Sequence, residues 1–82
     1  MKVTTENLEN YIENYIEEAK DFAPTLFNNI EEQQSNPEKF YCTLSEAVYN
    51  GAIQEFKGLD EIWEKINGDN LCYKIAKKIQ RG

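Results

Sequence analysis

The side chains with the clearest chemical potential in this sequence are carboxylates set at regular spacing near the start of the chain. Five of them follow one another at intervals of three or four positions, namely Glu6, Glu9, Glu13, Glu17 and Asp21. Residues three or four apart share one side of an α-helix, so these carboxylates would form a single acidic ridge. Such a ridge can bind a basic protein surface, and we expect Tyr11 beside it to serve as an anchor.

The distribution of charge along the chain points to the same region. Residues 1–41 contain three basic and nine acidic residues, whereas residues 42–82 contain six of each, so the whole net charge of −6 comes from the first half. A charge run is usually only a solvated face that keeps a small protein soluble. Two other interpretations stay open: a docking surface for a basic partner, and neutralisation by the basic end of the chain, within the molecule or in a second copy.

The basic end of the chain is a second candidate site. Its members are Lys74, Lys77, Lys78 and Arg81, with Tyr73 beside them. Together they could hold a small anionic ligand such as a nucleotide, in a chain that would then act as a dimer. Four charges at one end are a weak footprint for nucleic acid, and the acidic net charge argues against direct nucleic-acid binding.

The residue types on which most enzymes rely are missing or isolated. The chain contains no histidine, which removes the usual general base near neutral pH and the commonest metal ligand. The serines and glycines are scattered, so no catalytic triad and no phosphate-binding loop is expected. Cys42 and Cys72 match no metal-binding spacing, and we interpret them as small buried thiols rather than a disulfide. We therefore expect neither an enzyme nor a metal or other cofactor.

An amphipathic helix must position the acidic ridge. Its apolar residues recur at alternating intervals of four and three, in the order Leu8, Ile12, Tyr15, Ala19, Phe22 and Leu26. This period predicts a helix from about Thr4 to Ala23, with Thr4 as the N-cap. Pro24 disfavours a continuous helix. The apolar face that resumes at Leu26 belongs either to a kinked helix or to a second helix from Pro24 to about Gln34, and we favour the second helix.

A capping box opens the next helix. In Thr43-Leu44-Ser45-Glu46 the threonine would cap the helix while the glutamate reaches back to it, and Gly58 stands where a helix ends. Asn50-Gly51 in between is also a hairpin signal, so an α+β fold with a hairpin at these two residues stays open. The capping box and the helical period favour a helix, in which Gly51 would let another helix approach closely.

Two further helices complete the expected fold. A short helix contains Leu59 and Trp63 and ends at Asn67-Gly68, and Asp69 caps a final helix. We therefore predict one all-α domain over residues 1–82, a small bundle of four to five short helices. Trp63 should lie in the core. The tyrosines at the edges of the apolar stripes are interpreted as half-buried packing or as interface anchors, namely Tyr11, Tyr41, Tyr49 and Tyr73.

Binding rather than catalysis is the function that these patterns favour. The leading hypothesis is a small acidic interaction module, with an inhibitor of a larger nucleic-acid-handling protein as its most specific form. Small acidic chains without cofactors occur among phage-encoded anti-defence proteins and bacterial immunity proteins, a comparison of type alone. No apolar stretch could cross a bilayer and no secretory signal is recognised, so a cytoplasmic location is expected, as in an infected bacterial cell. The alternatives are the dimeric anion binder and a helical domain that binds only itself.

Overall fold

The opening apolar stripe forms helix α1 (Thr5–Phe22), as predicted. The computed structural model describes residues 3–40 and 43–81, the last of them by its backbone alone. The Thr4 hydroxyl accepts a hydrogen bond from the backbone N–H of Asn7 at 3.1 Å, which confirms Thr4 as the N-cap. The stripe of α1 is buried through Leu8, Ile12, Ile16 and Ala19. Tyr41 and Cys42, for which burial or an interface role was predicted, lie outside the described residues.

Pro24 separates α1 from a second helical segment, but this segment is broken where one helix was predicted. Pro24–Phe27 forms a 3-10 turn, η1, and a separate helix α2 covers Ile30–Ser35. The break is at Asn29, whose backbone adopts the left-handed conformation with φ of 58°. Asparagine tolerates this conformation better than most residues because its short side chain can bond locally. A further 3-10 turn, η2 (Pro37–Lys39), follows α2.

Helix α3 (Leu44–Glu55) runs straight through the ambiguous Asn50-Gly51 pair, so the hairpin alternative is wrong. The Thr43 hydroxyl accepts a hydrogen bond from the Glu46 N–H at 3.2 Å, which confirms the first half of the capping box. The predicted close approach at Gly51 is also confirmed. A Cβ atom at this position would lie 2.7 Å from the Tyr11 hydroxyl oxygen, so glycine leaves room for this side chain of α1 against α3.

The final part of the chain contains the short helix α4 (Leu59–Ile62) and helix α5 (Gly68–Arg81). Between them Asn67 adopts a left-handed conformation, and the Gly68 N–H donates to the Trp63 carbonyl at 2.9 Å. The prediction that Asp69 caps α5 is wrong, because α5 already begins at Gly68. The Asp69 carboxylate instead accepts a hydrogen bond from the indole N–H of Trp63 at 3.1 Å.

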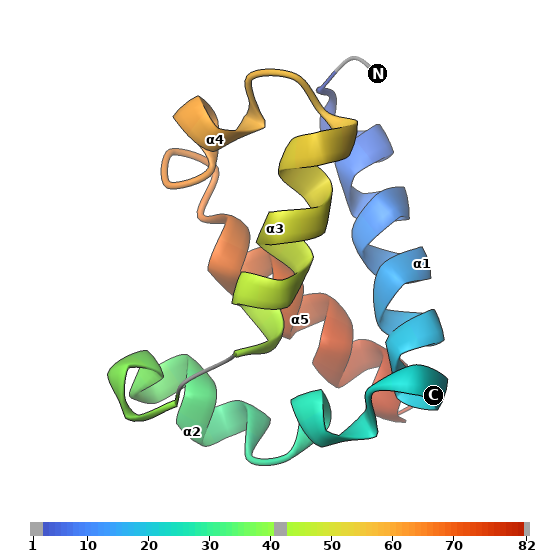
Figure 1. Ribbon diagram of the computed structural model, residues 1–82, viewed down its shortest axis with the longest axis vertical. Helices are drawn as coiled ribbons and strands as arrows, with labels where there is room; N and C mark the ends of the chain where they lie inside the picture. Colours follow the sequence, from blue (N-terminus) through green and yellow to red (C-terminus); the bar gives the residue numbers. More distant parts are fainter. Residues whose placement is uncertain (1–2, 41–42, 82) are drawn as a thin grey trace.

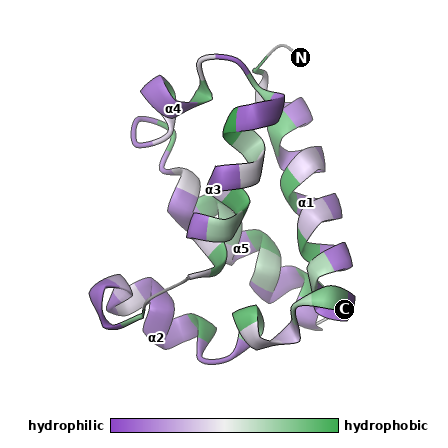
Figure 2. Ribbon diagram, in the orientation of Figure 1, coloured by the Kyte–Doolittle hydropathy of each residue, from purple (hydrophilic) through white to green (hydrophobic). Residues whose placement is uncertain are grey.

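Helices α1, α3 and α5 pack against one another and enclose the core, while α2 and α4 lie at its edges (Figure 1). Hydrophobic and hydrophilic residues alternate along these helices (Figure 2), and the buried core residues of all three are predominantly apolar. Phe56, Leu44 and Val48 are fully buried, together with Leu8, Ile12, Ile16 and Ala19 of α1. Of the other predicted stripe residues on this helix, Tyr15 is only half-buried and Phe22 is exposed. No strand occurs in residues 3–40 and 43–81, so the predicted all-α bundle is confirmed. None of the described helices is both long enough and apolar enough to cross a bilayer.

Gly68 is the glycine whose replacement we expect to cost most. A Cβ atom there would lie 2.4 Å from two ring atoms of the buried Trp63, and neither the ring nor the helix start can move freely. We expect Gly68→Ala to lower the free energy of unfolding by roughly 1–3 kcal/mol, measured by urea denaturation. Gly51→Ala is the matched control, because the end of the Tyr11 side chain can move away. Equal stability of Gly68→Ala and the wild type would contradict this packing.

Candidate functional site

The acidic ridge predicted on α1 is exposed to solvent. Its five carboxylate side chains all lie on the outer flank of the helix, away from the buried stripe, and these are Glu6, Glu9, Glu13, Glu17 and Asp21. The ion pair found among the described side chains joins Lys39 to Glu32 and involves no ridge residue. The ridge therefore carries its negative charge at the surface of the monomer.

Tyr11, the predicted anchor of the ridge, packs between α1 and α3. Its ring meets the ring of Phe56 edge to face, with 5.6 Å between the centroids, and its hydroxyl lies over Gly51. Burial raises the pKa of the Tyr11 phenol, and the nearby Glu55 carboxylate raises it further. Tyr11 thus holds α1 in place, and the carboxylates form the outward surface.

The predicted anion-binding residues do not converge on one site. Tyr73 is buried, and its hydroxyl donates a hydrogen bond to Gln33 at 3.2 Å in the core. Lys77 donates to the Gln34 side chain at 2.7 Å and shares a hollow with Glu31 and Glu32. Two other lysines face a different groove, opposite α1, and these are Lys74 and Lys78. The side chain of Arg81 lies outside the described residues.

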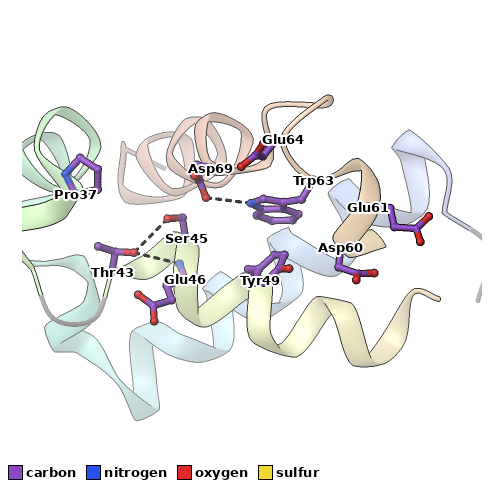
Figure 3. A pocket seen from close by; sticks show the side chains of 10 residues that line it. All are labelled: Pro37, Thr43, Ser45, Glu46, Tyr49, Asp60, Glu61, Trp63, Glu64 and Asp69. Carbon is purple, nitrogen blue, oxygen red and sulfur yellow. Dashed lines mark hydrogen bonds between the residues drawn. The ribbon is translucent and has the colours of Figure 1, made fainter. Parts of the chain in front are cut away.

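A second acidic surface, absent from the predictions, lies in a hollow of about 390 Å³. Residues of α3, of α4 and its following turn, and of the start of α5 surround it, on the other side of α3 from α1 (Figures 1 and 3). Five of its ten lining residues are acidic and none is basic. The five are Glu46, Asp60, Glu61, Glu64 and Asp69.

Two aromatic rings lie at the centre of this acidic hollow (Figure 3). Tyr49 and Trp63 meet edge to face with 5.1 Å between their centroids, and the bond from the indole N–H to Asp69 fixes the orientation of Trp63. Aromatic faces and carboxylates both attract cations, so a lysine or arginine side chain is the chemical group that this lining would bind. Among the described residues, no three potential ligands are close enough to hold a metal ion.

The net charge of residues 42–82 gives no sign of this acidic hollow, because that half of the chain has as many basic as acidic residues. The fold separates its charges: five of the six acids between residues 46 and 69 line the hollow, Glu55 being the exception, whereas the last lysines lie on α5. A count over residues 46–69 alone would have revealed the excess, since this window has six acidic residues and only Lys57 and Lys65 as basic ones.

The prediction of a buried thiol is confirmed for Cys72, and its burial has a measurable consequence. Burial raises the pKa of the Cys72 thiol from the ordinary value of 9.0 to about 12, with a further contribution from Asp69. The stability contributed by the neutral thiol is therefore fully present below pH 9 and is lost as the pH rises towards 12. Between about pH 8 and pH 10, the wild type should lose about 1 kcal/mol more unfolding free energy than Cys72→Ala. Equal losses of unfolding free energy by the wild type and Cys72→Ala over this pH range, measured by urea denaturation, would contradict this effect of burial.

Comparison with known proteins gives no match: no family model, no curated protein and no solved structure resembles this chain. The features of this molecule that point to a function are therefore its two acidic surfaces and the groove between α1 and α5.

Proposed function

We propose that this protein is an acidic interaction module that binds a basic surface of a larger protein and covers it. The observation that carries this proposal is the exposure of all five ridge carboxylates on one flank of α1, with no ion pair to a described cation. A solvated face and a docking surface both need this exposure. A docking surface also needs a rigid support, which the buried stripe of α1 and the Tyr11 contact provide.

Binding would proceed by long-range attraction followed by close contact. A row of like charges attracts a basic surface over a distance set by the salt concentration, about 10 Å at 0.1 M, and so raises the association rate. The acidic hollow adds a second negatively charged surface, where Tyr49 and Trp63 could hold one basic side chain of a partner. Both surfaces lie on helices that pack on the core, so little ordering is needed on binding.

Inhibition is the form of this function that the chemistry favours. A basic surface on a larger protein is often one that contacts nucleic acid, and an 82-residue acidic chain bound there would block it by charge and by volume. This role, in the cytoplasm of a bacterial host, requires neither catalysis nor a cofactor. The lysines of α5 face different hollows, so they do not form the single site that an anion-binding function would need.

Affinity capture from a lysate of the native host tests this proposal. The immobilised protein should retain one or a few basic proteins at about 50 mM salt and release them at about 500 mM, because screening weakens exposed charge pairs. Capture that is equally strong at both salt concentrations, or a partner without a basic surface, would contradict the proposal.

A further inference from the structure

A groove with an apolar floor runs along the junction of α1 and α5. Its floor consists of Leu71, Ile75 and Ile79, which are only half-buried, and its volume is about 370 Å³. At Leu71 it continues into a second hollow of about 270 Å³, whose lining includes Ile62 and Ile66. Ile66 is one of the two most exposed large apolar side chains described, with 40% of its surface accessible. The monomer thus leaves a continuous apolar strip in contact with solvent.

The two rims of this groove carry opposite charges. Glu9 and Glu13 form an acidic rim on α1, and Lys74 and Lys78 form a basic rim on α5. No ion pair joins the two rims among the side chains that the structure describes. A face with an apolar centre, one acidic edge and one basic edge is complementary in charge to a suitably turned copy of itself.

We propose that a second copy of this chain closes the groove, with the two α5 helices parallel to each other. Identical faces meet about a two-fold axis that lies in the plane of contact. If the axis runs along α5, the helices are parallel and each acidic rim faces the basic rim of the other copy. If it runs across α5, the helices are antiparallel and rims of like charge face each other. Charge complementarity therefore selects the parallel arrangement.

This arrangement pairs each floor residue with its own counterpart. Leu71, Ile75 and Ile79 are spaced at four residues, so they form a single apolar row that two parallel helices can share. Burying this row adds apolar contact to a domain whose own core is small. The dimer also covers both charged rims, so two of the five ridge carboxylates, Glu9 and Glu13, face the second copy. The other three ridge carboxylates and the acidic hollow stay outside the contact and can still meet a partner. This inference goes beyond the proposed function and does not depend on it.

Molecular mass in solution, followed by sedimentation against concentration, gives the first test. The wild type should reach twice the chain mass of 9.6 kDa. Two double variants each reverse the charge of one rim: Glu9→Lys with Glu13→Lys, and Lys74→Glu with Lys78→Glu. Each should raise the dimer dissociation constant about tenfold or more. An equal mixture of these two variants should recover the wild-type value to within about threefold, because every facing pair of rims is again opposite in charge. Lys57→Glu with Lys65→Glu is the matched control, since these exposed lysines do not line the groove.

A monomer at every concentration, or a dimer that both rim variants leave unchanged, would overturn this inference. The four rim residues with substitutions are exposed, and circular dichroism verifies that each variant keeps its helices. Loss of the dimer and loss of the proposed function are distinguishable, because partner capture can be tested by substitutions at Glu6 and Glu17, which lie outside this contact.

Cysteine cross-linking distinguishes the two helix directions. In a Cys42→Ser background, Leu71→Cys alone and Ile79→Cys alone should each form a disulfide-linked dimer under mild oxidation, because parallel helices bring equivalent positions together. Cys72 is buried, with the pKa of its thiol raised to about 12, so it does not compete. Linkage only in the mixture of the two variants would indicate antiparallel helices and overturn the parallel dimer. No linkage in any sample would overturn the contact itself.

Discussion

Phe56→Ala is expected to lower the free energy of unfolding by about 3–5 kcal/mol, the usual cost of deleting a fully buried aromatic side chain. Phe56 is the C-cap residue of α3 and has no exposed surface. Its ring also supports the ring of Tyr11 from α1, edge to face. The substitution therefore leaves a cavity and removes the support that holds the ridge-bearing helix. For a small domain with a stability of about 5–10 kcal/mol, this loss is a large fraction of the total.

Urea denaturation followed by circular dichroism measures this change. Phe22→Ala is the matched control, because 63% of the Phe22 surface is exposed at the end of α1. The control should lose less than about 1 kcal/mol, although Phe22 also meets Tyr15 edge to face. Equal losses for the two variants would show that Phe56 is not a core residue in solution.

Gln33→Leu should lower the free energy of unfolding by about 2–4 kcal/mol, although it replaces a polar residue with an apolar one. Gln33 is buried on α2, and its amide oxygen accepts hydrogen bonds from the Leu44 N–H at 3.0 Å and the Tyr73 hydroxyl at 3.2 Å. Its amide nitrogen donates to the carbonyls of Leu26 at 3.1 Å and Asn28 at 2.8 Å. Leucine would leave the buried Leu44 N–H and Tyr73 hydroxyl without this partner.

A double-mutant cycle distinguishes this network from a general intolerance of substitution. Tyr73→Phe removes the hydroxyl that donates to Gln33. The double variant should therefore lose less free energy of unfolding than the two single variants lose in total, by about 0.5 kcal/mol or more. Gln54→Leu is the control, since Gln54 is exposed and its side-chain amide donates to the Asn50 carbonyl within the same helix. Additive losses in the cycle would contradict a direct role for the Gln33–Tyr73 hydrogen bond.

The elements that the sequence predicts well are those that short-range physics determines. The N-cap at Thr4, the buried stripe from Leu8 to Ala19 and the cap at Thr43 each depend on residues within one or two helical turns. Gly51 in a helix was correctly interpreted as a place of close approach, because a glycine within an otherwise helical pattern has few other uses.

The features missed by the sequence analysis depend on contacts far apart in the chain. Gln33 bonds Tyr73 across 40 positions, and nothing near it in the sequence indicates that a glutamine is buried. Aspartate is a common helix cap, yet the Asp69 carboxylate accepts a hydrogen bond from the Trp63 indole N–H instead. The acidic hollow joins segments from residue 37 to residue 69, so its charge becomes visible only once the fold brings them together.

The ridge was predicted as a set of residues on one helical face, and the structure places all five in solvent. Whether they bind a partner depends on their position as well as on their charge. Reversing two ridge charges and reversing two charges elsewhere change the net charge equally. Such a pair of variants therefore separates a docking surface from a merely acidic protein.

Capture from the native host's lysate by three immobilised proteins makes this comparison directly. These are the wild type, Glu6→Lys with Glu17→Lys on the ridge, and Glu31→Lys with Glu38→Lys away from it, where both side chains are also exposed. At about 50 mM salt we expect the wild type and the control to retain the same basic protein and the ridge variant to lose it. Equal retention by the ridge variant and the control would contradict the ridge as the docking surface.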